Sequence, residues 1–122
     1  LVGFFLAGLG TLGGMESWWL QEELTKLDNL VLFIGATGLT AITDNAALTY
    51  LGSLVELTDS AKYNLVAGAV AGGGLTVIAN APNPAGYGIL KGSFSGGINP
   101  GKLLLGAMPP TIVACICFQV LM

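Results

Sequence analysis

A single carboxylate interrupts a long apolar stretch of this chain. Between Leu30 and Val55 the only charged residue is Asp44, which lies within Thr43-Asp44-Asn45. An aspartate at the centre of a membrane helix costs about 2.5 to 3.5 kcal/mol on insertion. Acidic residues inside membranes are therefore rare, and they usually mark an ion or proton pathway. The position of this residue predicts a polar site within an apolar surrounding.

The composition indicates that the lipid bilayer is the solvent of this chain. Hydrophobic residues make up 53% of the chain and charged residues 9%, with a mean hydropathy of +0.78, whereas soluble domains carry roughly 25% charged residues. The chain has no histidine and only four basic residues, so it offers no basic patch for nucleic acid and lacks the commonest general base. We therefore expect a multi-pass protein of the cell inner membrane, with no enzymatic activity, no cofactor and no nucleic-acid partner.

Apolar and polar segments divide the chain into parts of one transmembrane domain. Residues 1–14 are apolar but shorter than the roughly 20 residues of a full span, so we expect the end of a helix there. Residues 15–28 carry Trp18 and Trp19 among charged residues, which favours an amphipathic helix at the membrane surface over a polar loop. The remaining parts are a hairpin at 29–57, a broken helix at 63–91 and a final helix at 102–122.

The segment 29–57 is too long for one untilted span and is polar at its centre. Two interpretations remain: one tilted span, or a re-entrant hairpin whose tip is Thr43-Asp44-Asn45. Non-helical backbone at membrane depth is tolerated where it lines a cavity or lies inside protein, and a binding site at the tip would meet this condition. Lys91 and Lys102, in a loop without acids, favour the hairpin because lysines mark the cytoplasmic side. Gly72-Gly73-Gly74 would allow close packing against this hairpin.

The next apolar segment is interrupted by Asn80-Ala81-Pro82-Asn83-Pro84. Pro82 and Pro84 remove two backbone donors and disfavour helix at the residues before them. One proline is enough for a kink, so two prolines bracketed by asparagines predict an unwound segment, with helix resuming from Ala85. Half-helix ends at such breaks present their dipoles to ions, and the two asparagine amides would serve as ligands.

These two interruptions predict one cation site, since hard cations such as Na⁺ and Li⁺ prefer oxygen ligands. A carboxylate that binds either a cation or a proton is the minimum equipment for exchange. We expect Na⁺ to be held by Asp44, Asn45 and Asn80. The full predicted site comprises Asp44, Asn45, Thr43, Thr49, Asn80 and Asn83, with Pro82 and Pro84 opening the helix. The competing interpretation is a structural Asp44 that is protonated or hydrogen-bonded to hydroxyl groups.

The motif Thr43-Asp44-Asn45-Ala46-Ala47-Leu48, followed by the break from Asn80 to Gly86, resembles the C-terminal half of the ion transporter superfamily. The chain is most similar to its putative Na⁺/H⁺ antiporter family, over about residues 30–122. The resemblance implies two inverted repeats, each with a re-entrant hairpin and an interrupted helix, in homodimers with elevator-like motion. The chain would then be the C-terminal repeat, with an N-terminal repeat of the same transporter as its partner.

The expected protein is an all-α polytopic membrane protein that exchanges Na⁺ or Li⁺ for H⁺. One alternative is a sodium-coupled transporter of the same fold that carries dicarboxylate or arsenite. The dicarboxylate branch has Ser-Asn-Thr motifs that this chain lacks at both the hairpin and the break, which favours cation exchange. A second alternative is a non-transporting membrane subunit, in which Asp44 would affect assembly only.

Overall fold

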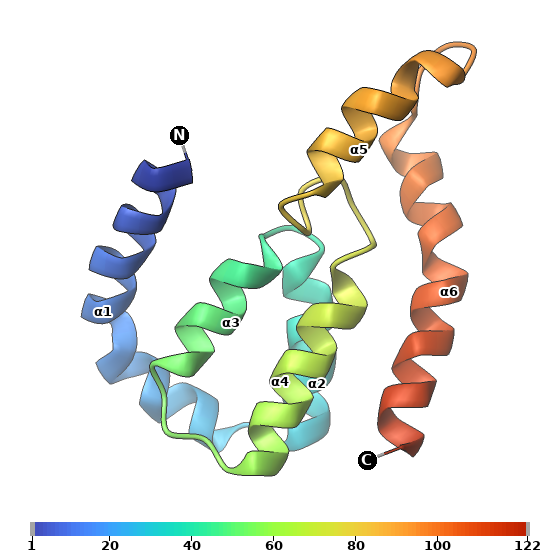
Figure 1. The fold of residues 1–122 in the computed structure, drawn as a ribbon. Coiled ribbons are helices and arrows are strands. Elements are labelled where there is room, and N and C mark those ends of the chain that lie inside the picture. The colour runs from blue at the N-terminus through green and yellow to red at the C-terminus, as the bar shows by residue number, and fades with distance from the viewer. Residues whose placement is uncertain (1, 122) are drawn as a thin grey trace.

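The computed structural model describes residues 2–121, which fold into helices joined by turns and short loops (Figure 1). That part of the chain contains no strand, so the all-α fold class is confirmed. The helices are α1 (Val2–Lys26), α2 (Asn29–Thr40), α3 (Asn45–Ser53), α4 (Asp59–Gly72), α5 (Asn83–Leu90) and α6 (Pro100–Val120), and a 3₁₀ turn, η1 (Lys91–Ser93), follows α5.

The first helix is continuous, which corrects the expected division between residues 1–14 and 15–28. α1 is a single helix of 25 residues. Gly13 and Gly14 each cost about 1 kcal/mol relative to alanine, but no proline interrupts the helix at this point. The helix therefore continues through both glycines and ends shortly before Asp28, which caps α2 through its side chain.

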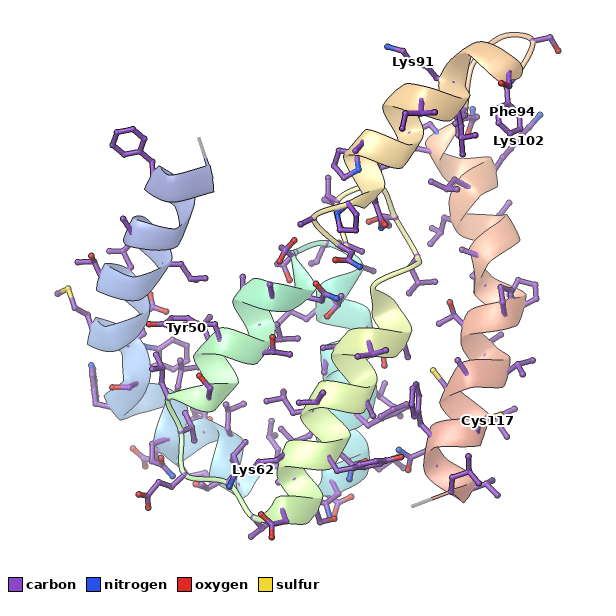
Figure 2. All side chains as sticks on the ribbon, in the orientation of Figure 1. Tyr50, Lys62, Lys91, Phe94, Lys102 and Cys117 are labelled. Atoms are coloured by element: carbon purple, nitrogen blue, oxygen red, sulfur yellow. The ribbon has the colours of Figure 1, made fainter. Side chains whose placement is uncertain are left out.

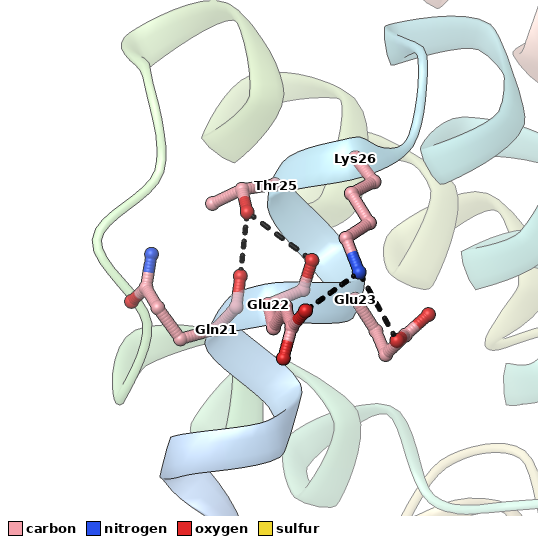
Figure 3. Close-up of polar contacts among 5 residues, drawn as sticks. All are labelled: Gln21, Glu22, Glu23, Thr25 and Lys26. Atoms are coloured by element: carbon pink, nitrogen blue, oxygen red, sulfur yellow. Dashed lines mark hydrogen bonds and ion pairs between the residues drawn. The ribbon is translucent and has the colours of Figure 1, made fainter.

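The C-terminal end of α1 is charged and is tied to the loop before α4. Lys26 Nζ lies 3.0 Å from Glu22 Oε1 and 3.6 Å from Glu23 Oε1, as Figure 3 shows. Gln21 Nε2 donates to the carbonyl oxygen of Glu56 at 3.1 Å, and Gln21 Oε1 accepts from the N–H of Glu56 at 2.8 Å. The placement of this end at a membrane surface stays a prediction.

The segment 29–57 contains two helices joined by a turn at the predicted tip. α2 ends at Thr40 and α3 begins at Asn45, so residues 41–44 form the turn. In Figure 1, α2 lies behind α4, whereas α3 lies on the side that faces α1. The alternative prediction, in which one continuous tilted helix runs through residues 29–57, is therefore wrong. The entry and return of the hairpin through one face of a membrane stays a prediction.

The second predicted interruption is present, but it starts earlier than expected. α4 ends at Gly72 instead of near Ala79. Gly73 and Gly74 follow directly, and glycine costs about 1 kcal/mol per residue in a helix relative to alanine. The helix therefore ends before the prolines are reached. Residues 73–82 contain no helix and are called the helix break below.

The helix after the break also starts earlier than expected. α5 begins at Asn83 instead of Ala85, with Pro84 in its first turn and Pro82 as the capping residue. Proline is tolerated there because the first N–H groups of a helix have no intrahelical partner. α4 likewise begins at Asp59, before the predicted start of the broken helix at residue 63.

Among residues 2–121, α6 is the one helix that is long and apolar enough to cross a membrane. Its most apolar stretch of 18 residues has a mean hydropathy of 1.9. The whole helix of 21 residues extends for about 30 Å, which matches the hydrocarbon core of a bilayer. α6 runs back beside α5 and α4 (Figure 1). Its last turns are held to α4 by two hydrogen bonds: Tyr63 Oη donates to the Phe118 carbonyl oxygen at 2.8 Å, and Gln119 Nε2 donates to Asn64 Oδ1 at 3.0 Å.

α2 and α4 pack closely along a seam of small residues. A Cβ atom built on Gly68 would overlap the carbonyl oxygen of Phe33, and one built on Gly72 would overlap the carbonyl oxygen of Thr37. The predicted close packing of Gly72-Gly73-Gly74 against the hairpin is confirmed for Gly72 and for Gly73, whose added Cβ would lie 3.1 Å from Asn45 Nδ2, but not for Gly74, whose added Cβ would meet no atom within 4 Å. The contacts follow the small-residue packing typical of membrane helices. The buried apolar core beside this seam comprises Leu32, Ala36, Val55, Leu57, Ala61 and Leu65.

Candidate functional site

The hairpin turn and the helix break contact each other through one backbone hydrogen bond and one hydrogen bond from a side chain to the backbone. The N–H of Asn45 donates to the carbonyl oxygen of Ala79 at 3.1 Å, and Thr76 Oγ1 donates to the carbonyl oxygen of Ala41 at 2.7 Å. Asn45 is the first residue of α3, where helical N–H groups have no intrahelical partner. Ala79 belongs to the helix break, so its carbonyl oxygen is available. Each interruption therefore satisfies backbone groups of the other, and the two predicted polar segments meet.

Asp44 caps α3. Its Oδ1 accepts hydrogen bonds from the N–H groups of Ala46 at 2.8 Å and Ala47 at 3.3 Å, and its backbone has the extended geometry of a capping residue. The side chain is half-buried. Within residues 2–121, no hydrogen bond engages the second carboxylate oxygen, Oδ2. One oxygen of Asp44 is thus anchored to the helix, and the other remains open for a ligand.

Asn83 and Asn80 have different surroundings in the break. Asn83 Nδ2 donates to the carbonyl oxygens of Gly73 and Thr76, both at 2.8 Å, so its amide group closes the break into a compact loop. The backbone N–H of Asn83 also donates to the carbonyl oxygen of Asn80 at 3.0 Å. The side-chain amide of Asn80 is half-buried and forms no hydrogen bond within the described residues. Asn83 therefore shapes the break, and Asn80 retains a free amide.

The hydroxyl groups of the two predicted threonines are each bonded to a backbone carbonyl oxygen four residues earlier in the chain. Thr43 Oγ1 donates to the carbonyl oxygen of Leu39, and Thr49 Oγ1 to that of Asn45, each at 2.9 Å. Such bonds are typical of threonine in helices, and each oxygen keeps lone pairs. Thr43 borders Asp44 in the turn. Thr49 lies one helical turn into α3, and no hydrogen bond within the described residues connects it to the helix break.

Thr40 is a residue of this region that the predicted site did not include. Its side chain is 0% exposed, and its Oγ1 forms no hydrogen bond within the described part of the chain. Leaving a buried hydroxyl unsatisfied costs about 1 to 3 kcal/mol, so it requires a physical explanation. Thr40 is the last residue of α2, immediately before the turn, and it packs against Gly72. Its burial depends on the packing of α4, which no local pattern encodes.

The region offers one carboxylate and neutral oxygens as possible cation ligands. Residues 2–121 contain no group of three histidine, cysteine or acidic side chains that could hold a metal ion, so a cation at the turn would rely on one carboxylate and neutral oxygens. A cavity of about 250 Å³ lies between the break and the start of α6, with Thr76, Asn83, Tyr87 and Leu103 among its lining residues. Asp44 is not part of its wall, so the candidate site is the contact between turn and break.

A protein-family model with the description "Putative Na+/H+ antiporter" matches residues 1–121. The comparisons with curated proteins and with solved structures found no match.

Proposed function

The chain belongs to this Na⁺/H⁺ antiporter family, and on that premise we propose that it exchanges Na⁺ or Li⁺ for H⁺ at the contact between the hairpin turn and the helix break. Membership of the family implies a transporter with a membrane location. We further propose which residues bind the cation, that Li⁺ is exchanged as well as Na⁺, and how the exchange proceeds.

The observation that carries the proposal is the hydrogen bond from the Asn45 N–H to the Ala79 carbonyl oxygen, at 3.1 Å. It holds the acidic turn against the segment that contains Asn80. Asp44 Oδ2 would then supply the negative charge, and the Asn80 amide and the Thr40 hydroxyl would supply neutral oxygens. Two interrupted helices that meet with their polar groups together are the usual form of a transporter ion site.

The exchange step is a competition for one carboxylate oxygen. In the cation-loaded state, Asp44 is ionised and Oδ2 binds Na⁺. When a proton binds Oδ2, the carboxylate becomes neutral and the cation leaves. Oδ1 stays on the N–H groups of Ala46 and Ala47 in both states, so the site keeps its geometry while its charge changes. One proton replaces one cation at the carboxylate.

We also propose the surroundings that the family resemblance implies. The chain would act as one repeat of a multi-pass protein in the cell inner membrane, with residues 29–57 as a re-entrant hairpin. An N-terminal repeat would contribute a second hairpin and a second broken helix, and two copies of the transporter would form a homodimer in the lipid bilayer.

The test is dissipation of a pH gradient in everted membrane vesicles that contain the protein, on addition of Na⁺, Li⁺ or K⁺. We expect Na⁺ and Li⁺ to collapse the gradient. Asp44→Asn should abolish the response, because asparagine keeps the helix cap but lacks the exchangeable charge. Asp28→Asn is the matched control, since Asp28 caps α2 through the Leu30 N–H at 3.3 Å and is exposed; it should exchange normally.

Two outcomes would reject the proposal. If no cation acts on vesicles that contain well-expressed protein, the protein is not a cation antiporter, and uptake of labelled dicarboxylate or arsenite becomes the next measurement. The cap formed by Asp44 argues against that alternative, because its carboxylate occupies the N–H groups to which an anion would bind. If Asp44→Asn exchanges as well as Asp28→Asn, the exchanging carboxylate is elsewhere.

A further inference from the structure

Charge is segregated along this molecule. All seven acidic residues lie between Glu16 and Asp59, and the rest of the chain carries lysines only. Lys26 and Lys62 form ion pairs with Glu22 at 3.0 Å and Asp59 at 3.7 Å. Within the described residues, Lys91 and Lys102 form no ion pair. Figure 2 shows both at the end of the molecule opposite Lys62. Residues 91–102 are called the basic tip below.

The basic tip contains a cleft between the end of α5 and the start of α6. Its volume is about 780 Å³, and its walls include Leu90, Phe94, Ser95, Asn99 and Lys102. Phe94 is 53% exposed, and Figure 2 shows it beside Lys102. The cleft thus combines a cationic group and polar groups with an apolar wall.

The sequence of the tip explains why its backbone forms this shape. Gly96 and Gly97 have φ angles of +89° and +76°, a conformation that other residues rarely adopt, so they reverse the chain between α5 and α6. Asn99 Oδ1 then accepts from the N–H groups of Gly101 at 2.9 Å and Lys102 at 3.1 Å. This cap starts α6 and places Lys102 in its first turn, on the wall of the cleft.

The position of α6 sets the depth of the cleft in a bilayer. α6 is about as long as the hydrocarbon core is thick, so a lysine in its first turn lies where that core meets the headgroups. Lysine side chains there extend toward the polar surface while their stems stay in apolar surroundings. An exposed phenylalanine beside that lysine can rest against the upper part of the acyl chains.

We propose that the cleft of the basic tip binds the headgroup of an anionic phospholipid. Lys102, on the wall of the cleft, pairs with the phosphate, and Phe94 and Leu90 contact the start of an acyl chain. Lys91 is not part of that wall and extends away from Lys102 (Figure 2), so it adds to the positive potential around the headgroup without lining the cleft. The charge distribution selects this occupant, since both lysines without an ion pair among the described residues lie here, in a part of the sequence that has no acidic residue. The apolar wall distinguishes a lipid from a free anion. The inference rests on the membrane location and not on cation exchange, so either can fail alone.

The test is a melting experiment on the purified protein in neutral detergent. Phosphatidylglycerol should raise the melting temperature, because a ligand of the folded state stabilises it. Phosphatidylcholine and inorganic phosphate should leave it unchanged. In the double variant Lys91→Gln/Lys102→Gln, the apparent affinity for phosphatidylglycerol should fall about fivefold for each lysine removed. Lys102→Arg should retain the affinity, because it keeps the charge at the cleft.

The matched control is Lys26→Gln/Lys62→Gln, which removes the same two charges from the opposite end. It should respond to phosphatidylglycerol as the parent does. Equal responses of the two double variants would overturn the proposal, because net charge alone would then govern lipid binding. If phosphatidylcholine raised the melting temperature as much as phosphatidylglycerol does, the lysines would have no role in lipid binding. A full response to inorganic phosphate would replace the lipid by a soluble anion.

Discussion

Gly72 and Thr40 face each other across the contact of α4 with α2: a Cβ atom on Gly72 would lie 3.0 Å from Thr40 Cβ and would overlap the carbonyl oxygen of Thr37. This approach seats the end of α2 on the last turn of α4, directly beside the hairpin turn and the helix break. The two positions therefore control both the packing of the hairpin and the surroundings of the candidate cation site.

Gly72→Ala should push α4 away from α2, because the added methyl group meets backbone that cannot rotate aside. Overpacking of this kind costs about 1 to 3 kcal/mol in the free energy of unfolding. Thermal melting of the purified protein measures the change. Gly74→Ala is the control, since no atom lies within 4 Å of the added Cβ, and an equal loss in both variants would show that the seam is unimportant.

Thr40→Val should stabilise the protein and weaken cation binding at the same time. Valine has the same shape without the unsatisfied hydroxyl, so the free energy of unfolding should rise by up to about 1 to 3 kcal/mol. The Na⁺ concentration for half-maximal exchange should also rise. Thr37→Val is the control, because the Thr37 hydroxyl already donates to the Phe33 carbonyl oxygen at 2.8 Å. Unchanged Na⁺ dependence in Thr40→Val would exclude Thr40 as a ligand.

Substitutions of Asp44 should separate its capping role from its charge. Asp44→Asn should unfold at nearly the same temperature as the parent, because asparagine caps helices about as well as aspartate, whereas Asp44→Ala should lose about 0.5 to 2 kcal/mol. Both should lose Na⁺-dependent exchange. Melting and vesicle exchange on the same samples provide the comparison. Exchange by the stable Asp44→Asn variant would mean that Asp44 is a structural residue only.

Asn83→Ala should affect the stability of the helix break, whereas Asn80→Ala should affect the Na⁺ dependence of exchange. Asn83→Ala removes the hydrogen bonds to the carbonyl oxygens of Gly73 and Thr76, which should loosen residues 73–82 and cost about 1 to 3 kcal/mol. Asn80→Ala removes no hydrogen bond within the described residues, so it should alter Na⁺ dependence with little loss of stability. Amide hydrogen exchange across the break, together with vesicle exchange, tests this; equal protection in both variants would contradict it.

Local chemistry was enough to predict that both apolar segments are interrupted, and it predicted the position of the first interruption. Asp44 precedes a helix-forming run, and Pro82 and Pro84 each remove a backbone donor and disfavour helix at the residue before them. The predicted tip is accordingly a turn, and the second apolar segment is broken. Their mutual contact was predicted as a cation site, and the Asn45–Ala79 hydrogen bond brings the two segments together. The cation itself stays a prediction.

Other features depend on packing that a single sequence does not reveal. Aspartate is a residue type that both caps helices and binds ions, so the sequence alone could not tell which of these two roles Asp44 has. The break starts at Gly73 because glycines end α4 ahead of the prolines. Thr40 is buried only because α4 covers the end of α2. In α1, by contrast, Gly13 and Gly14 lower the helix propensity but do not end the helix.

The close contact of α2 with α4 at Gly68 and Gly72 distinguishes this helix pair from α6 in how firmly the parts are joined. α2 and α4 touch through their backbones at Gly68 and Gly72, so they behave as one stiff body that carries both the hairpin turn and the start of the helix break. The last turns of α6 are joined to that body through the side chains of Tyr63 and Gln119. Relative displacement is therefore easier between α6 and this body than within it, and the groups proposed to bind the cation would travel together.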